Sequence, residues 1–446
     1  MSARRRILLA AQVTAVVIGV AACGATIDYV QVGADGGDGS AGSSDAGDGD
    51  RDASESPDRW AGPEGGYVRD PGRQSGAMQI TAVHTSATAD PSLAGRVARR
   101  WSKAFSGPAS FPLIAHDKVV VTYATADGRG EVQAFDAATG ASVWGPLDLG
   151  ESSTSSSAYD GGRVFSLTRK GTLRAFDVDT GALQWTTELG NPAVPIQFLA
   201  APTAYEGKVY VMPSNFGKAF AVNEVTGTVA WTSGSFGTYA SPAVTDDAVY
   251  IAINCETAYR LDPATGAVVW HVMGNCNSGA HTPAVFAGKL LVGGDNGSTT
   301  AIDLETGDAG TTRIGGWHAG AYGGMIYLAF NGTLDGRSFP AKPSGNVYWS
   351  TQDRMDPGMI RAAPMIAGGR VHALWSDCTL RAFEPLTGDL LWTDSEPAGC
   401  EGPGAYPAGP VSIAAAAGTI VVPFGSHIVT YGVTPASDGG ADASGD

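Results

Sequence analysis

The sequence lacks a basic cluster and the short motifs of several large enzyme classes. Its 28 Lys and Arg residues are outnumbered by 44 Asp and Glu residues, which gives a formal net charge of −16. A nucleic-acid partner requires a stripe of positive charge, so the composition excludes that class of partner. The chain also contains no nucleophile elbow, no phosphate-binding loop and no HExxH zinc motif. Hydrolase, nucleotide-binding and metalloprotease chemistry of those kinds is therefore not indicated.

Long apolar runs are missing too, apart from one short run at the N-terminus. Three arginines precede an apolar stretch from Ile7 to Ala22, and Cys23 follows it. The stretch is short for a membrane span, and the small residues before Cys23 are typical of a signal-peptide cleavage site. We predict a signal peptide at residues 1–22. The alternative is an uncleaved anchor with an ordinary cysteine at position 23.

The next segment and the last one contain almost nothing apolar to bury. Residues 23–60 and 434–446 consist mainly of Gly, Ser, Ala and Asp. Such composition cannot form a core, and the acidic residues repel one another. We predict a disordered acidic tether at residues 23–60 and a disordered acidic tail at residues 434–446. Residues 61–95 are expected to be an irregular lead-in, with no role assigned.

What the chain has in abundance is one repeated phrase. FDAATGASVW at Phe135–Trp144 returns at intervals of roughly forty residues, with turn glycines at Gly140, Gly181, Gly227, Gly266, Gly307, Gly345 and Gly388. An acid followed by Thr-Gly is a turn signal, and a Trp-bearing strand follows, so the phrase predicts a β-hairpin. Two further strand signals precede each hairpin. A fixed period of this kind predicts four-stranded propeller blades.

The first and last strands of the repeat region are expected to form one blade together. Seven units end at the seven hairpins, and residues after Trp392 supply three strand signals without a fourth. Arg96 to Phe105 supplies a Trp-bearing strand without partners before it. Pairing first and last strands would remove the open edges of the ring. We predict an all-β fold, an eight-bladed β-propeller of antiparallel four-stranded blades at residues 96–433, whose last blade is closed by the N-terminal strand.

The recurrent phrase resembles the pyrroloquinoline-quinone-type (PQQ-like) propeller repeat, which quinoprotein alcohol dehydrogenases share with BamB-like lipoproteins of the outer-membrane β-barrel assembly machinery. VAAC at the predicted cleavage site resembles a bacterial lipobox, which implies that Cys23 is lipidated. Gly24, in place of Asp, implies forwarding to the outer membrane in lipoprotein families. The resemblance covers about residues 96–433. It is specific for the fold but not for the function, because both enzymes and binding scaffolds use this repeat.

The tryptophans and the remaining four cysteines have predicted structural roles. A Trp at one fixed blade position fills the wedge between sheets, which we expect of Trp101, Trp144, Trp185, Trp231, Trp270, Trp349 and Trp392. Cys255 and Cys378 lie between second and third strands, and Cys276 and Cys400 follow fourth strands. These loops share one face, so we predict disulfides Cys255–Cys276 and Cys378–Cys400 in an exported chain. Four separate thiols are the alternative.

Few of the residues predicted to line the central channel could bind a cofactor or a metal. The resemblance to dehydrogenases implies a central quinone with calcium, an acidic base and an adjacent cysteine pair, but this chain has no adjacent cysteines. Small residues and no acid stand at the predicted starts of the innermost strands. His281, Trp317, His318 and Arg361 form the one cluster that could hold a polar ligand at the channel mouth, and imidazoles without further ligands are weak grounds for a metal.

These observations predict a non-enzymatic, monomeric propeller without cofactor or metal, lipid-anchored in the bacterial outer membrane. Its expected partners are envelope proteins, with the β-barrel assembly machinery implied by the resemblance; its membrane contact is expected through the lipid alone. Two alternatives stay open. One is a PQQ-dependent alcohol or sugar dehydrogenase, and the other is a polysaccharide-binding propeller.

Overall fold

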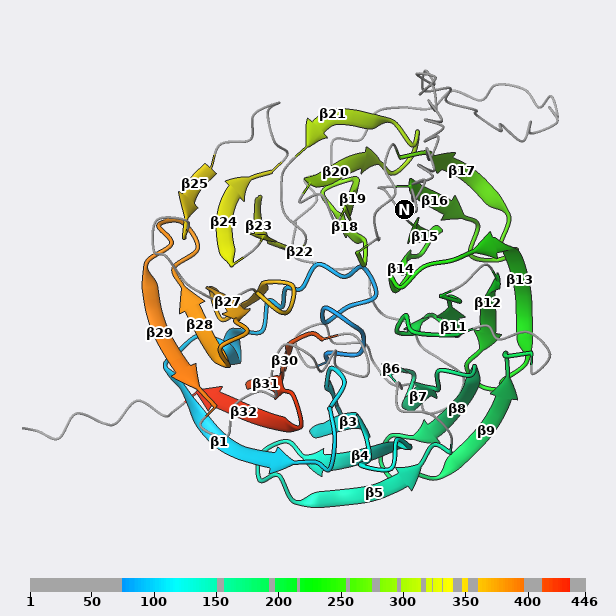
Figure 1. The fold of residues 1–446 in the computed structure, drawn as a ribbon, viewed down its shortest axis with the longest axis horizontal. Helices are drawn as coiled ribbons and strands as arrows, with labels where there is room; N and C mark the ends of the chain where they lie inside the picture. The colour runs from blue at the N-terminus through cyan, green and yellow to red at the C-terminus, as the bar shows by residue number, and fades with distance from the viewer. Residues whose placement is uncertain are drawn as a thin grey trace, which may run out of the picture.

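The computed structural model describes residues 74–150, 156–191, 197–214, 217–253, 257–274, 281–294, 298–313, 318–322, 324–330, 332–339, 347–351, 360–396 and 411–433. These residues form eight four-stranded antiparallel sheets and one 3-10 turn, η1 (Pro91–Leu93). The sheets stand around a common axis like the blades of a propeller (Figure 1). The predicted eight-bladed all-β fold is therefore confirmed. Among the described residues, no helix has the length and apolarity needed to cross a bilayer.

Each blade runs from the axis outward in chain order. The strands of blades 1 to 4 are β2 (Leu113–Ala115), β3 (Lys118–Ala124), β4 (Gly130–Asp136), β5 (Ser142–Asp148); β6 (Ser156–Asp160), β7 (Arg163–Leu167), β8 (Thr172–Asp177), β9 (Leu183–Glu188); β10 (Thr203–Tyr205), β11 (Lys208–Val211), β12 (Gly217–Asn223), β13 (Val229–Phe236); and β14 (Ala243–Thr245), β15 (Ala248–Ile253), β16 (Thr257–Leu261), β17 (Val268–Val272).

The remaining four blades follow the same plan, except that the last takes its outermost strand from the N-terminal end. Their strands are β18 (Ala284–Phe286), β19 (Lys289–Gly294), β20 (Ser298–Asp303), β21 (Ala309–Arg313); β22 (His318–Tyr322), β23 (Met325–Phe330), β24 (Thr333–Ser338), β25 (Val347–Ser350); β26 (Met365–Ala367), β27 (Arg370–Leu374), β28 (Thr379–Phe383), β29 (Leu390–Ser395); and β30 (Ala414–Ala416), β31 (Thr419–Phe424), β32 (His427–Val433), β1 (Val97–Ala104).

Burial along a blade explains which residues its strands use. The second strand is buried on both faces, as in β31, where all six residues are buried. In the outermost strand, exposed residues alternate with half-buried ones, as in the second half of β9. A proline directly precedes five of the short innermost strands, where its missing N–H costs no ladder bond. Those prolines are Pro112, Pro202, Pro242, Pro283 and Pro364.

The repeated hairpin has the turn chemistry that its sequence predicts. In blade 1 the Asp136 Oδ1 accepts hydrogen bonds from the Thr139 backbone N–H at 2.8 Å and from the Thr139 hydroxyl at 2.7 Å. These bonds lower the pKa of Asp136. Gly140 then takes φ +70°, the left-handed conformation that glycine adopts without strain. The same acid-Thr-Gly arrangement recurs at Asp262, Thr265 and Gly266 in blade 4.

Each tryptophan of the repeat fastens its blade to the hairpin of the next blade. The Trp144 indole N–H donates to the Val178 carbonyl oxygen at 2.8 Å, and its ring lies against Gly181. The contact is buried and combines a hydrogen bond with ring packing. Five other tryptophans repeat the bond to the next hairpin: Trp101 to Ala137, Trp185 to Glu224, Trp231 to Pro263, Trp270 to Leu304 and Trp349 to Pro385.

Strand β1 closes the ring as the sequence predicts. It pairs antiparallel with β32, from Val97 opposite Val433 to Ala104 opposite His427. Figure 1 shows the two strands side by side, blue against red, although they lie at opposite ends of the chain. Arg99 of β1 also forms ion pairs with Asp394, within the outer strand of blade 7, and with Glu396, directly after that strand. The last blade thus loses its open edge to the first strand.

The glycine contact of the hairpin gives a direct test of the inter-blade fastening. A Cβ added at Gly181 would lie 2.8 to 3.0 Å from Trp144 ring atoms, whereas one at Gly207 would meet nothing within 4 Å. Both glycines have positive φ, +72° and +80°. We expect Gly181→Ala to cost about 3 kcal/mol of unfolding free energy in urea titration, and Gly207→Ala about 1 kcal/mol. Equal losses in the two variants would contradict the account of the Trp144 contact.

Candidate functional site at the centre of the ring

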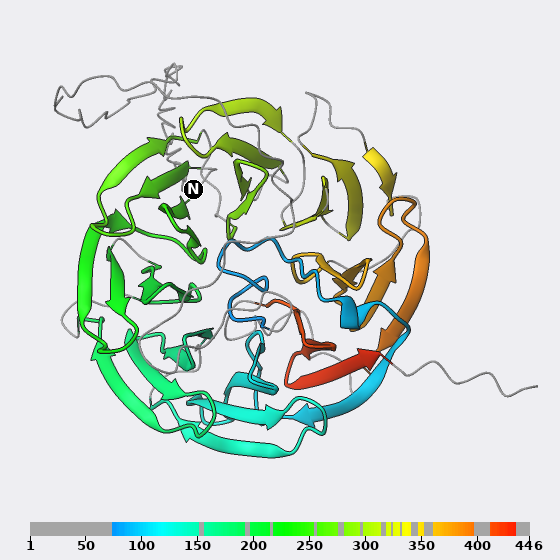
Figure 2. The ribbon, with the colours of Figure 1, turned by 180° about the vertical axis from the view of Figure 1, so that it is seen from behind.

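Residues 74–95 cross the centre of the ring before the chain reaches β1. Figures 1 and 2 show this segment, in blue, running between the innermost strands in both views. Its carbonyl bonds follow the order of the blades from Ser75 at blade 1 to Ser86 at blade 7, and Asp90 then bonds to blade 8. Gln79 departs from this order, because its N–H donates to the Ser412 hydroxyl just before blade 8. We name residues 74–90 the central segment. Sequence analysis assigned this stretch no role, so it is the functional element that sequence reasoning missed.

Backbone carbonyls of the central segment bind one equivalent amide in each of six blades. Each donor is the residue at the same register position of its innermost strand, opposite the second residue of the next strand. Amides that point to the axis would otherwise be buried without an acceptor, which is costly. The six bonds, all 2.7 to 3.0 Å, are Ile114 to Ser75, Tyr159 to Gly76, Val244 to Ala82, Val285 to Val83, Ala321 to Thr85 and Ile366 to Ser86.

The two ends of the central segment are held by additional bonds. At the first end, the Ser75 N–H donates to the Ile114 carbonyl at 2.8 Å, which makes a two-bond bridge with β2. At the second end, Asp90 caps η1 by accepting from the Ser92 N–H at 2.9 Å. The other Asp90 oxygen accepts from the Gly418 N–H at 2.7 Å, in the turn between β30 and β31. Both ends are thus fixed to blades that are neighbours in the ring.

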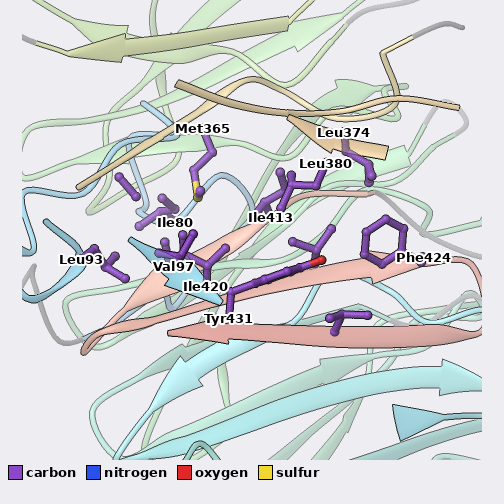
Figure 3. Packing of buried hydrophobic residues seen from close by; sticks show 14 of the residues in the cluster. Ile80, Leu93, Val97, Met365, Leu374, Leu380, Ile413, Ile420, Phe424 and Tyr431 are labelled. Carbon is purple, nitrogen blue, oxygen red and sulfur yellow. The ribbon is translucent and has the colours of Figure 1, made fainter. Parts of the chain in front are cut away.

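Apolar side chains fasten the segment and the following turn to blades 7 and 8. Ile80 and Leu93, each 1 % exposed, belong to one buried cluster with Met365, Ile420 and Tyr431. Figure 3 shows Leu93 beside Val97 and Ile80 above them, between the strands of the two blades. Burial of such side chains stabilises the fold by about 1.5 to 3 kcal/mol each. The central segment is therefore part of the core as well as a set of hydrogen bonds.

A histidine stands where the segment turns between blades 3 and 5. His84 is fully buried, and its Nδ1 lies 3.1 Å from the Pro283 carbonyl oxygen. Its Nε2 lies 3.5 Å from the Thr203 hydroxyl. Burial without a charged partner lowers the pKa of His84 to about 4, although the Pro283 carbonyl opposes the shift. The ring is therefore neutral near pH 7, donating to a carbonyl from one nitrogen.

The predicted cluster at the channel mouth is only partly within the described residues. His281 and Arg361 are half-buried and precede the innermost strands of blades 5 and 7, which are not adjacent. The Arg361 N–H donates to the Leu374 carbonyl at 2.8 Å. Trp317 and the side chain of His318 lie outside the described residues. A ligand held by these four residues remains a prediction.

The centre of the ring does not fit the quinone that related dehydrogenases hold. Such a cofactor carries three carboxylates and needs cations or a metal to offset them, because buried unpaired charge is costly. The chain's own backbone carbonyls take the inward amides of six blades. The described residues also bring no three His, Cys, Asp or Glu side chains together in a way that holds a metal ion. The geometry supports a closed axis rather than a cofactor cavity.

The fold and its closed centre define a propeller of the PQQ-like repeat class. A family model with the description "Outer membrane protein assembly factor BamB" matches residues 66–146, 128–308 and 310–437. The chain belongs to this family.

Curated relatives of the same description share modest identity. The protein named outer membrane protein assembly factor BamB in Yersinia pestis is 28% identical over 269 residues, covering 54% of this chain and 65% of the relative. The one in Moranella endobia is 27% identical, covering 52% of this chain and 54% of the relative. The chain thus spans between about half and two thirds of the length of these relatives.

Solved structures agree with the architecture. The crystal structure of BamB from Moraxella catarrhalis superposes with a TM-score of 0.57 at 17% identity, covering 76% of this chain and 99% of that chain. A europium-containing methanol dehydrogenase superposes with a TM-score of 0.60 at 14% identity, covering 82% of this chain and 99% of that chain. At these identities, both likenesses establish the fold alone.

The four predicted disulfide cysteines can be placed only in part. Cys378 lies in the turn between β27 and β28, 6 % exposed and with φ +67°. Cys255, Cys276 and Cys400 lie outside the described residues. In the chain, these three cysteines follow β15, β17 and β29, and Cys378 follows β27. We propose the pairs Cys255–Cys276 and Cys378–Cys400.

Peptide mapping without reduction tests this pairing. We expect linked peptides that join Cys255 to Cys276 and Cys378 to Cys400, and loss of both links after reduction. Loops of this size stabilise a fold by about 3 kcal/mol in the chain-entropy treatment, so reduction should lower the unfolding free energy. Links between Cys255 and Cys378, or four alkylated thiols before reduction, would show that the proposed pairing is wrong.

The buried histidines make stability depend on pH in the acid range. His84 and His372 both have a pKa of about 4 in the folded protein, below the ordinary value of 6.5, because of burial. The unfolded chain takes up these protons first, so the stability is complete above about pH 6.5 and falls towards pH 4. We expect His84→Gln to reduce the slope of unfolding free energy against pH by about 1.4 kcal/mol per pH unit in this window.

Chemical denaturation at a series of pH values measures this slope. His372→Gln provides the matched comparison, since its imidazole is equally buried but lies on β27 outside the central segment. Each single variant should reduce the number of protons taken up on unfolding by about one, and the double variant should reduce it by about two. A slope in His84→Gln equal to that of the unchanged protein would contradict a neutral His84 in the folded state.

Proposed function

We propose that this protein is a non-catalytic scaffold of the bacterial outer membrane that binds other envelope proteins, in β-barrel protein assembly. The proposal follows the family, whose description is an outer membrane protein assembly factor. We further propose that Cys23 carries a lipid and that residues 23–60 act as a tether between the membrane and the ring. The protein would then meet its partners as a monomeric disc held away from the membrane surface.

The occupied centre is the observation that carries the proposal. Six inward amides bind carbonyls of the chain's own central segment, so the position where related dehydrogenases hold their quinone is taken by backbone. Catalysis by a quinone also requires a base within reach of the substrate hydroxyl. With the axis occupied in this way, we assign the partners of the proposed scaffold to the surface of the disc. A binding scaffold uses the fold in that manner.

One face of the ring exposes an aromatic side chain and a long apolar side chain next to its outermost strands. Met273 follows the outermost strand of blade 4 and is 65 % exposed, and Tyr239 follows that of blade 3 and is 60 % exposed. Both stand on the face formed by the loops that follow fourth strands. Large apolar and aromatic side chains exposed together are typical of protein-binding surfaces. We assign this face, with Tyr239 and Met273 as anchors, to the partner.

A capture experiment on envelope extract tests the proposed function. The lipidated protein should retain outer-membrane assembly proteins, identified by mass spectrometry. We expect a Tyr239→Ser, Met273→Ser double variant to lose about tenfold or more of that capture, because central anchors contribute about 1 to 2 kcal/mol each. The Cys23→Ser variant should no longer be found in the membrane fraction, but it should still capture the same proteins from detergent extract.

The opposite face supplies the matched control. Val225 and Leu386 are 58 % and 61 % exposed on the repeated hairpin turns, which point the other way. A Val225→Ser, Leu386→Ser double variant should capture the same proteins as the unchanged chain. Loss of capture in this variant alone would show that partners bind the opposite face from the one that we propose. Absence of any assembly protein from the captured set would contradict the proposed function.

A further inference from the structure

The central segment occupies a site that recognises polypeptide backbone. Its six donors are amides at one equivalent position of six innermost strands, and each binds a carbonyl oxygen of the segment. In one of the six pairs the bond is reciprocal: the Ile114 carbonyl also accepts from the Ser75 N–H. A ring of donors that reads carbonyls makes few demands on side chains. A segment that follows the same turned path presents the same acceptors.

One steric requirement limits which segments fit. A Cβ added at Gly76 would lie 2.8 Å from the Tyr159 carbonyl oxygen and 3.3 Å from its Cδ1 atom. The obstacle is backbone, which cannot rotate away. A segment that follows the same path therefore needs glycine where it passes blade 2. The site thus has a chemical class of ligand, a turned polypeptide segment with a glycine at this position.

The central segment is itself a strained occupant of this site. Four of its non-glycine residues have left-handed backbone, namely Gln79 at φ +56°, Ile80 at +78°, His84 at +57° and Ser86 at +55°. For a β-branched residue such as Ile80 this conformation is a clear outlier. Strain of this kind persists only where the surroundings impose it, and it gathers at switch regions.

Buried polar atoms add to the cost of keeping the segment in place. Four of its side-chain oxygens are buried and have no hydrogen-bond partner: Ser75 Oγ, Gln79 Oε1, Thr81 Oγ1 and Ser86 Oγ. Each of these oxygens would regain hydrogen bonds with water if the segment left the centre. The segment therefore holds the site through its backbone bonds and apolar contacts, against an opposing set of strained and unsatisfied groups.

The segment can leave without opening the ring. Asp90 caps η1 and binds the Gly418 N–H, and the buried Leu93 follows, so the chain is fixed again before β1 begins. The pairing of β1 with β32 does not involve residues 74–90. The axis and the closing strand are therefore separate units, with Asp90 as the boundary between them.

We propose that the inward amides form a binding site for a turned, glycine-containing segment of another polypeptide, which residues 74–90 occupy as a displaceable intramolecular competitor. This inference goes beyond the scaffold function, because it assigns a second binding site at the axis. Its failure would leave capture through the Tyr239 and Met273 face untouched. Opening of the segment, rather than of the whole ring, would control access.

Two variants move the competition in opposite directions. Gly76→Ala places a Cβ against the Tyr159 carbonyl and should release the segment. Ser86→Gly removes a left-handed Cβ and an unpartnered hydroxyl, and should hold the segment more tightly. Ala89→Ser is the matched control within the same segment, since Ala89 is exposed. All three are made in the full mature chain.

Hydrogen exchange of the innermost strands reports release. In Gly76→Ala we expect the amides of Ile114, Tyr159, Val244 and Ile366 to exchange at least about tenfold faster, with the hairpins of the outer strands unchanged. Ser86→Gly should slow the same amides, and Ala89→Ser should leave them as they are. Exchange that rises equally in inner and outer strands, or that does not differ among the variants, would overturn the proposal.

Binding of a synthetic peptide tests the site itself. The probe is a labelled peptide with the sequence of residues 74–90, and a second peptide carries valine in place of its glycine at position 76. The first peptide should bind Gly76→Ala saturably at one per chain and restore slow exchange of the inner amides, while Ser86→Gly should bind it at least about tenfold more weakly. Equal binding of the valine peptide, or no binding of the first peptide, would overturn the proposal.

Discussion

The ring depends on the contact between a tryptophan and the glycine hairpin of the following blade. At Trp144, one hydrogen bond to Val178 and the close approach to Gly181 set the spacing of two sheets. Six blades use this contact, and Trp392 packs edge-on against Tyr431 where the eighth blade has no hairpin of its own. Because neighbouring blades meet mainly through such repeated contacts, closure by β1 completes an otherwise additive assembly.

A ring built in this way leaves its innermost strand edges facing one another, and their amides need acceptors. The central segment supplies them from residues 75 to 86, in the order in which the blades follow one another. The cost is a left-handed backbone at Ile80 and Ser86, and buried side-chain oxygens such as the Ser86 Oγ that have no hydrogen-bond partner. The same segment explains why this fold can do without a cofactor at its axis, and why partners would be met at the faces.

The sequence predicts the ring well because its signals are local and repeated. Acid-Thr-Gly turns and the tryptophan of each hairpin fix strand order and blade number, and the unpaired strand at Arg96 to Phe105 predicts closure. The central segment has no such signal. Its bonds are made by backbone carbonyls to residues far along the chain, from Ile114 to Ile366, so side-chain identity carries little information about them. Gly76, required by the Tyr159 carbonyl, is the one sequence feature that marks its path.

The central claim is that the chain's own backbone, and no quinone, fills the axis. Equilibrium dialysis of the purified mature protein with pyrroloquinoline quinone and calcium tests it most directly, together with a dye-linked assay on alcohols and sugars. The account predicts no saturable binding and no turnover. Stoichiometric binding of the quinone, with faster exchange of the Ile114 and Ile366 amides as the central segment is expelled, would contradict it.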